Sequence, residues 1–344
     1  ACCHEKSRSR HRSAHHPLRR AGQGLGGTVR AMSQNASARF TPTTLLLLVI
    51  PPLMWAGNAV VGRMMQGVVP PITLNFLRWV LAFAMLLPVA GWVLRPGSDL
   101  WKHWRRFALL GLLGVGCYNA LQYLALKTST PMNVTLVAAS TPVWMLLLGR
   151  LLYGVRISRM AALGAALSLS GVAVVLSRGH LEKLLSVQLV PGDAWVLLAS
   201  VLWAWYSWLL ARPRPGADPT AIKADWAAFL LAQMVMGLAW SGLFAAGEWL
   251  TLPDLPEGQS HIQWGWPLAA ALVYVAVGPS LLAYRCWGAA VARVGPAMAS
   301  VFSNLTPLFA ALMSATLLRE PPSAYHAAGF VLIVGGILVS SRKG

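Results

Sequence analysis

The chain has 344 residues, of which 56% are hydrophobic and only 11% are charged. Soluble domains usually carry about 25% charged residues, so this apolar excess is too large for one soluble core. The formal net charge of +18 would alone suggest a nucleic-acid partner. However, the Lys and Arg residues mostly stand ahead of the apolar runs or in short connections between them, as insertion in a bilayer requires. We therefore expect a membrane protein with no nucleic-acid partner.

Residues 1–42 form a basic tail that carries 8 of the 28 Lys and Arg residues. Residues 1–31 are rich in Arg, His, Ser and Gly and lack apolar periodicity, which is typical of a disordered segment. Met32 opens a short polar lead to the first apolar run, so we expect it to be the native start and residues 1–31 to be an upstream extension. A mass spectrum of the native N-terminus checks this expectation, and a peptide from residues 1–31 would contradict it.

Ten apolar runs follow the tail. A hydrocarbon core of ~30 Å needs about 20 apolar residues per helix, and each run meets or approaches that length. Because a lipid-facing backbone has to satisfy its own hydrogen bonds, the runs predict an all-α polytopic membrane protein with ten transmembrane helices. The expected spans are residues 43–65, 71–94, 107–126, 131–152, 159–177, 193–210, 222–245, 267–291, 296–317 and 324–341.

The positions of Lys and Arg predict the orientation of these spans. With the N-terminus inside, the inner segments hold 21 of these residues and the outer segments hold only Lys127, Arg178, Lys183 and Arg319. Positive charge gathers on the cytoplasmic side of membrane proteins. We therefore expect a multi-pass protein of the plasma (inner) membrane with both termini in the cytoplasm.

The second half of the chain repeats the first at fixed spacings. Gly and Pro mark backbone geometry, so their matches at one spacing are hard to obtain by chance. Each half holds five spans, an odd number, so residues 43–177 and 193–341 are expected to be two inverted five-helix repeats. A spacing of 165 relates Pro131 to Pro296, Thr141-Pro142 to Thr306-Pro307, Gly164 to Gly329 and Gly171 to Gly336, and a spacing of 148 relates Trp55-Ala56 to Trp203-Ala204 and Pro71 to Pro219.

Inverted repeats are typical of alternating-access transporters, whose substrate site lies near the bilayer midplane between the repeats. Trp55 lies about 18 Å into its span, near that depth. Asn119 and Gln122 are three residues apart and therefore share one helix face. Packing and hydrogen bonding between helices are the alternative roles for such side chains. The predicted cavity residues are Trp55, Asn58, Tyr118, Asn119, Gln122, Thr141, Trp203, Tyr206, Asn304 and Thr306.

Several motifs, taken together, resemble the EamA type of the drug/metabolite transporter superfamily over residues 43–341. The resemblance implies ten helices around a central cavity and the movement, by export or import, of a small metabolite. On this resemblance, we expect an amino acid or a related compound, with export as the direction. The family usually carries a Glu after spans 4 and 9; Glu320 occupies the second position, but Val155 stands in the first. The motifs are residues 53–58 (Leu-Met-Trp-Ala-Gly-Asn), Pro71 with Arg78, residues 118–126 (Tyr-Asn-Ala-Leu-Gln-Tyr-Leu-Ala-Leu), and the regions of Pro142 and Pro307.

Pro142, Pro279 and Pro307 interrupt apolar runs and are the predicted helix bends. A proline inside a helix frees a carbonyl group and permits a bend, which suits a helix that moves or lines water. A static kink is the alternative.

Arg78 and Glu320 are the candidates for charge pairing. Arg63, Arg78 and Arg285 lie toward the ends of spans, and although each could pair with a substrate carboxylate, we expect them to extend to the lipid headgroups. No Asp or Glu falls at a midplane. We therefore expect that proton coupling, if present, does not use a central carboxylate.

Two other classes of function compete with a carrier. A membrane enzyme needs converging acids, bases or metal ligands, and a channel needs a filter of charged or carbonyl-rich residues. The sequence holds no Ser-His-Asp, HExxH, P-loop or CxxC arrangement, and its four Cys residues lack metal-ligand spacing. We therefore expect no enzyme activity, cofactor or metal, with a small-molecule substrate and the lipid bilayer as partners. Glycine-rich faces can pack helices between two copies as readily as within one, which leaves a homodimer open.

Overall fold

The computed structural model describes residues 41–129, 131–180, 182–185, 190–254, 256, 259–318 and 324–342. Every regular element within these ranges is a helix. The predicted basic tail lies outside them up to residue 40. An all-helical chain satisfies the backbone hydrogen bonds of each segment internally, as lipid requires.

Nine helices of the described ranges are long and apolar enough to span a bilayer, so the chain is a multi-pass membrane protein. The last predicted span corresponds to α18 (Ala324–Ser340), an apolar helix of 17 described residues. Short helices α4 (Asp99–Lys102), α10 (Glu182–Leu185) and α12 (Thr220–Ala224) lie in the connections. The nine spans are built from α2 (Pro42–Met64); α3 (Pro71–Ala90) with η2 (Gly91–Leu94); α5 (Trp104–Leu110), η3 (Gly111–Cys117) and α6 (Tyr118–Ala125); α7 (Pro131–Ala138) and α8 (Thr141–Tyr153); α9 (Arg159–Leu176); α11 (Pro191–Ala211); α13 (Trp226–Trp249); α14 (Trp266–Val275), η4 (Ala276–Leu282) and α15 (Ala283–Val294); and α16 (Pro296–Ser303) with α17 (Leu305–Leu318).

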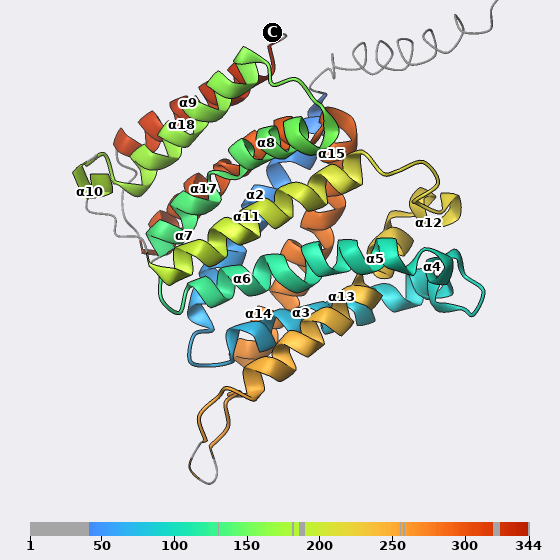
Figure 1. Ribbon diagram of the computed structural model, residues 1–344. Coiled ribbons are helices and arrows are strands. Elements are labelled where there is room, and N and C mark those ends of the chain that lie inside the picture. The colour runs from blue at the N-terminus through green and yellow to red at the C-terminus, as the bar shows by residue number, and fades with distance from the viewer. Residues whose placement is uncertain are drawn as a thin grey trace, which may run out of the picture. The chain divides into compact units, whose positions relative to one another are not determined.

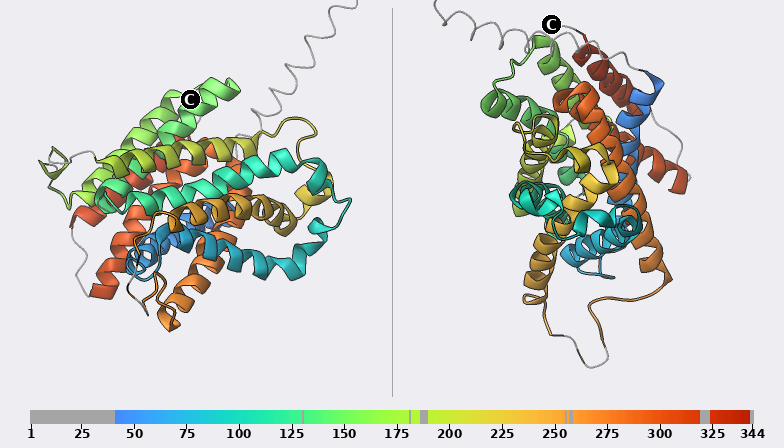
Figure 2. Two further views of the ribbon diagram at one scale, coloured as in Figure 1. Left: turned by 60° about the horizontal axis from the view of Figure 1, so that its bottom comes forward. Right: turned by 90° about the vertical axis from the view of Figure 1, so that its right-hand side faces the viewer.

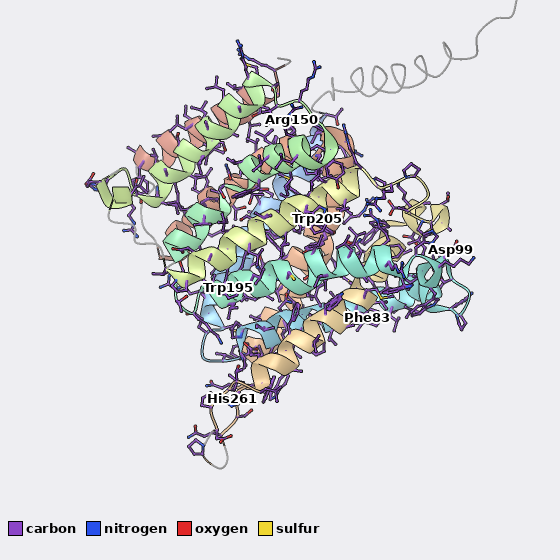
Figure 3. The ribbon with its side chains drawn as sticks, in the orientation of Figure 1. Phe83, Asp99, Arg150, Trp195, Trp205 and His261 are labelled. Atoms are coloured by element: carbon purple, nitrogen blue, oxygen red, sulfur yellow. The ribbon has the colours of Figure 1, made fainter. Side chains whose placement is uncertain are left out.

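The connections between spans gather at two opposite ends of the helix bundle (Figure 1 and Figure 2). The connection with α10 lies at one end, and those with α4 and α12 lie at the other. In Figure 3, Asp99 and Arg150 mark one end of the bundle and His261 marks the opposite end. At the Asp99 end, Arg106 of α5 pairs with Asp218 at 2.9 Å. Successive spans therefore run in opposite directions, as repeated crossing of a membrane requires.

The outer faces of the bundle expose apolar side chains. Leu151 is 67% exposed and Val331 is also 67% exposed. Soluble proteins rarely expose large contiguous apolar patches, whereas a lipid environment stabilises them. Trp264 and Trp266 are also exposed and lie close to the start of a span, where amphipathic rings meet the headgroups.

A carboxylate from α13 caps the start of α3. None of the side chains of α3 or its N-cap residue performs this role. Instead, Glu248 accepts hydrogen bonds from the N–H of Ile72 at 3.1 Å and from the N–H of Thr73 at 2.8 Å. Its side chain is only 2% exposed. A negative group at a helix N-terminus satisfies free N–H groups and complements the helix dipole, so this contact fixes α13 against α3.

Two spans contain a wide-turned, π-helical stretch at corresponding positions. The bounds of η3 and η4 differ by 165 residues, the spacing that also relates α7 to α16. A π-helical turn disrupts the regular pattern of hydrogen bonds and often occurs at functional sites. In η4, Pro279 contributes to this, because proline has no N–H to donate. The helices are therefore interrupted at equivalent places in the two halves.

Helices α9 and α18 approach each other closely through glycines. A Cβ on Gly336 would lie 2.5 Å from the carbonyl oxygen of Gly164, and a Cβ on Gly171 would lie 2.8 Å from that of Gly329. Small residues permit such contact between membrane helices. The spacing of 165 relates Gly164 to Gly329 and Gly171 to Gly336. The contact between Gly164 and Gly336 is therefore repeated by the contact between Gly329 and Gly171, with the two helices exchanged. A two-fold rotation between the helices produces this reciprocal pattern.

Gly336→Ala is expected to lower the thermal unfolding midpoint of the purified protein in detergent. The new methyl group would meet backbone atoms of Gly164 and Ser168, which cannot move independently. Overpacking of this kind costs about 1–3 kcal/mol. Gly335→Ala is the matched control, because its Cβ would meet only the Leu167 side chain, at 3.4 Å. Equal midpoints for the two variants would contradict the close crossing.

Candidate functional site

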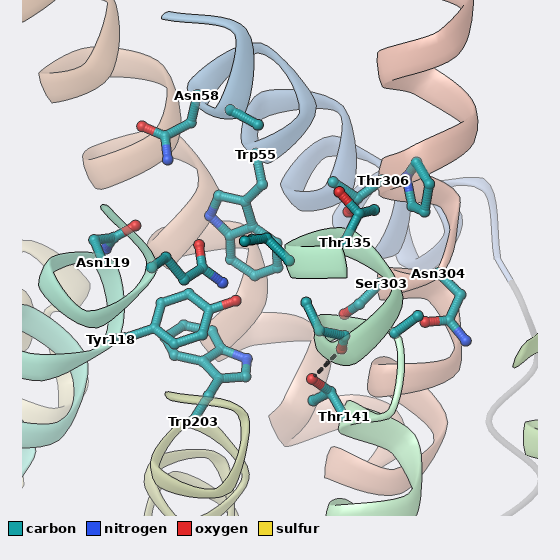
Figure 4. A pocket seen from close by; sticks show the side chains of 16 residues that line it. Trp55, Asn58, Tyr118, Asn119, Thr135, Thr141, Trp203, Ser303, Asn304 and Thr306 are labelled. Carbon is teal, nitrogen blue, oxygen red and sulfur yellow. Dashed lines mark hydrogen bonds between the residues drawn. The ribbon is translucent and has the colours of Figure 1, made fainter. Parts of the chain in front are cut away.

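A cavity with a volume of about 100 Å³ lies where α2, α6, α7 and α11 meet the junction of α16 and α17 (Figure 4). Side chains from both halves of the chain form its wall. None of the described residues that line it is charged. They are Trp55, Asn58, Ala59, Tyr118, Asn119, Gln122, Val134, Thr135, Ala138, Ala139, Thr141, Trp203, Ser303, Asn304, Thr306 and Pro307.

Nine of the ten residues predicted to face a central cavity line this one. The exception is Tyr206, which packs on Trp203 and lines a second cavity. Thr135 and Ser303 also line the first cavity, and the sequence did not single them out. The nine are Trp55, Asn58, Tyr118, Asn119, Gln122, Thr141, Trp203, Asn304 and Thr306.

Some polar groups of the first cavity have hydrogen-bond partners within the described part of the protein, and others do not. Thr141 Oγ1 donates to the carbonyl oxygen of Ala138 at 2.6 Å (dashed in Figure 4), and Asn304 Nδ2 donates to Ser168 Oγ at 3.0 Å. In contrast, Asn119 is only 2% exposed, and its Nδ2 atom has no acceptor with good hydrogen-bond geometry in the described part of the chain, although its side chain interacts with that of Tyr284. The wall formed by α6 therefore offers a hydrogen-bond donor that the protein satisfies poorly.

Aromatic rings gather around Trp203, which is 1% exposed. Tyr118 stacks on it with a centroid distance of 4.4 Å, and Tyr206 stacks on it at 5.1 Å. Trp55 and Tyr284 each meet it edge-on at 5.4 Å. Trp55 and Trp203, the equivalent residues of the two halves, thus touch each other. Offset and edge-on aromatic pairs are favourable, so the cluster forms a packed wall of the cavity.

Two members of this cluster, Tyr284 and Trp287, were missed by the sequence analysis. Both are buried, and Trp287 lies 5.5 Å from the Trp203 ring. The repeat spacing of 165 could have found them, because it relates Asn119 to Tyr284 and Gln122 to Trp287. They were missed because the second half has aromatic rings where the first half has the amides Asn119 and Gln122, so the residue types do not match across the repeat.

A second cavity, with a volume of about 230 Å³, lies beyond the aromatic cluster. Tyr206 and Tyr284 line it, and both rings contact Trp203. The Trp203 ring therefore lies between the two cavities. Unlike the first cavity, the second includes charged residues and lies close to α12. Its remaining lining residues are Leu210, Asp218, Lys223, Trp226, Phe229, Leu230, Gln233, Arg285, Gly288, Ala289 and Ala292.

The three predicted bend prolines lie at or near interruptions of helices. Pro142 is in the first turn of α8, Pro307 is the third residue of α17, and Pro279 is inside η4. A proline in a first turn replaces an N–H that would have no helical acceptor, so it marks a helix start at little cost. Pro51 and Pro52, in contrast, lie within the continuous helix α2.

The expectation that Arg78 extends to the headgroups is wrong. Its side chain is completely buried. Arg78 Nε donates to Ser280 Oγ at 2.9 Å, and Nη1 donates to Asn58 Oδ1 and to the Tyr123 hydroxyl, both at 3.1 Å. These three acceptors come from η4, α2 and α6, which are distant in the sequence. Periodicity along α3 alone could not reveal that they converge on one guanidinium.

Two of the other charged residues named for the spans, Arg63 and Arg285, do not line the first cavity. Arg63 is exposed. Arg285 is also exposed, with its guanidinium carbon 5.3 Å from the centre of the Trp226 ring. Glu320, the second candidate for charge pairing, lies outside the described residues. Glu248 was not singled out by the sequence analysis, and its carboxylate is occupied at the start of α3.

The first cavity can therefore bind a small molecule by two means. Amide and hydroxyl groups of Asn58, Asn119 and Gln122 can hydrogen-bond to polar groups. The rings of Trp55 and Trp203 offer flat apolar surface to the rest of the molecule.

A comparison with protein families gives a match to the EamA-like transporter family. The match covers residues 42–177 and again residues 190–342, so most of the chain is included.

Individual relatives are similar over nearly their full length. An uncharacterized transporter of Archaeoglobus fulgidus is 28% identical over 87% of this chain and 98% of its own length. The aromatic amino acid exporter YddG of Ancylobacter novellus is 26% identical over 84% of this chain and 93% of its own length. One solved crystal structure of a protein shares the fold with a TM-score of 0.64. It is 23% identical, over 86% of this chain and 95% of its own.

Ser280→Ala is expected to destabilise the protein, because it removes the acceptor of a buried guanidinium N–H. Hydrogen bonds to charged groups contribute about 1.5–3 kcal/mol. Thermal unfolding in detergent measures the effect. Ser200→Ala is the matched control, since Ser200 is equally buried and bonds only to the carbonyl oxygen of Val196 in its own helix. If both variants unfold at the same temperature, the hydrogen bond from Arg78 to Ser280 does not stabilise the protein.

Proposed function

The chain belongs to the EamA-like transporter family, and from this premise we propose that it is a secondary carrier for export. The substrate is a small metabolite, an amino acid or a related compound, which crosses the plasma (inner) membrane by alternating access. The observation that carries the proposal is the first cavity. Both halves of the chain enclose this cavity. Its described lining contains no charged residue, so no direct ion pair would slow the release of a substrate.

The proposed architecture is ten spans in two inverted repeats, residues 43–177 and 193–341, with both termini in the cytoplasm. Three observations support it: the family matches twice along the chain, η3 and η4 are 165 residues apart, and the glycines of α9 and α18 pack reciprocally. The excess of Lys and Arg in alternate connections supports the orientation.

The proposed mechanism uses the two cavities in turn. The first lies toward the end of the bundle that carries Asn58 and Gln122, and the second lies toward α12. The Trp203 ring blocks direct passage between them. Because the spans are interrupted at α7–α8 and α16–α17, short segments beside the cavity can rotate without unwinding a whole helix.

The proposed substrate class fits the chemistry of the cavity wall. An amino acid has two polar groups for the amides of α2 and α6, and its side chain can lie against Trp55 and Trp203. The Ancylobacter relative is named as an exporter of aromatic amino acids, which suits a cavity with aromatic walls.

Untargeted metabolite profiling of the medium from over-expressing cells tests the proposal. We expect one class of amino compounds to accumulate outside with the unmodified chain. The double variant Trp55→Ala/Asn119→Ala, at matched membrane abundance, should abolish this accumulation because it removes one aromatic and one amide from the cavity. The control Trp266→Ala/Gln259→Ala also removes one tryptophan and one side-chain amide, but from exposed positions, and should behave like the unmodified chain.

Flux into proteoliposomes then separates the classes of function. A carrier saturates with substrate concentration, a channel gives nearly linear flux, and an enzyme forms product. Identical media from the unmodified chain and the cavity variant would contradict export through this cavity.

A further inference from the structure

Arg78 carries a charge that no anionic group in the described part of the chain balances, although its guanidinium carbon lies 5.4 Å from the centre of the Trp79 ring. A guanidinium keeps its proton under all ordinary conditions. The three side chains that accept its hydrogen bonds, Ser280, Asn58 and Tyr123, are all neutral. None of the ion pairs among the described residues includes Arg78, and its Nη2 atom has no partner. A buried charge without a counter-ion is strongly unfavourable.

The described carboxylate that contacts the same helix, Glu248 of α13, does not serve as that counter-ion. Glu248 binds the N–H and hydroxyl groups of Thr73 at the start of α3. Thr73 precedes Arg78 by five residues, which is about 7.5 Å along a helix axis. The second oxygen of Glu248 accepts from the N–H of Ile72. This carboxylate is therefore engaged at the helix terminus.

Asn58 connects the buried charge with the first cavity. Its Oδ1 atom accepts from Arg78 Nη1 at 3.1 Å and from the Tyr123 hydroxyl at 2.7 Å. The amide nitrogen must then face away from Arg78, and Asn58 lines the cavity. In Figure 4 this nitrogen points into the space between Trp55 and Asn119. Asn119 contributes a second amide nitrogen, which is buried and has no acceptor with good hydrogen-bond geometry among the described residues, although its side chain interacts with that of Tyr284.

This end of the cavity thus presents N–H donors with a positive charge behind them. The complementary group accepts hydrogen bonds, offers no donor and carries a negative charge. A carboxylate meets all three conditions, whereas a carboxamide has the same shape but no charge and two donors of its own.

We propose that the cavity binds its substrate through a carboxylate, which accepts hydrogen bonds from Asn58 and Asn119 and balances the charge of Arg78 across Asn58. The proposal rests on the proposed carrier function and names the part of the substrate that the carrier recognises. Arg78 is a positioning residue, because it contacts Asn58 and does not itself line the cavity. Charges attract strongly across a protein interior, so a substrate without the carboxylate binds more weakly.

Paired probes test the carboxylate without knowledge of the substrate. Sodium propionate and butyrate are compared with propionamide and butyramide at constant ionic strength, on the purified full chain in detergent. Quenching of tryptophan fluorescence reports binding, because Trp55 and Trp203 line the cavity. We expect each acid to bind at least about tenfold more tightly than its amide. Arg78→Met should remove this preference, and Arg78→Lys should retain it.

Asn58→Asp supplies a built-in counter-ion. It places a carboxylate within 3.1 Å of Arg78 Nη1 at almost unchanged shape. We expect this variant to unfold at a higher temperature than the unmodified chain and to lose the preference for acids over amides. Asn304→Asp is the matched control, since it adds the same charge to the same cavity away from Arg78 and should lower the unfolding temperature.

The outcomes are distinct. Equal binding of acids and amides, or destabilisation by Asn58→Asp as large as by Asn304→Asp, would overturn the carboxylate site. Neither measurement involves flux, so the carrier function would stand in that case. A chain that prefers acids but exports no metabolite would lose the proposed function and keep the anion site.

Discussion

The hydrocarbon interior of a bilayer offers no hydrogen-bond partners, and the rest of this structure follows from that constraint. A polar group that enters a span bonds either to a nearby backbone carbonyl or to a group on another helix. Glu248 of α13 accepts from the start of α3, and Ser280 of η4 accepts from Arg78 Nε. These contacts join segments that are far apart in the sequence. The polar residues therefore help to determine which helices are neighbours, as the glycines do for α9 and α18.

The two halves share backbone geometry but differ in side chains. The wide-turned stretches and the breaks between short helices recur at the same spacing. At equivalent positions, however, Asn119 corresponds to Tyr284 and Asn58 corresponds to Tyr206. At these positions the first cavity has an amide where the second has a phenol ring. If the halves exchange conformations during transport as proposed, they exchange unequal environments, so the substrate meets different hydrogen-bonding partners in the two cavities.

Much of this could be predicted from sequence, and the limits have a physical origin. Apolar length and the Gly and Pro spacing depend on local backbone properties, so they identified the helices and the glycines that meet between α9 and α18. Depth within a span brought nine cavity residues to attention. The site of Arg78 was predicted wrongly, because extension to the headgroups and burial against Asn58 and Tyr123 produce the same pattern along α3. Only the tertiary arrangement distinguishes them. Of the aromatic partners of Trp203, Tyr284 and Trp287 were missed for a similar reason, since the sequence does not show which aromatic residues of distant helices meet.

The position of Trp203 places a further condition on transport. Its ring lies between Tyr118 of α6 and Tyr206 of its own helix α11, with Tyr284 of α15 against its edge. The hydroxyl of Tyr206 also donates to Gln233 of α13. A rotation of the Trp203 side chain alone would collide with these rings, because aromatic interiors are close-packed. Opening a path between the cavities therefore requires α6, α11 and α15 to move relative to one another. Since α6 belongs to the first half and α11 and α15 belong to the second, the proposed passage between the cavities opens only when the two halves move relative to each other.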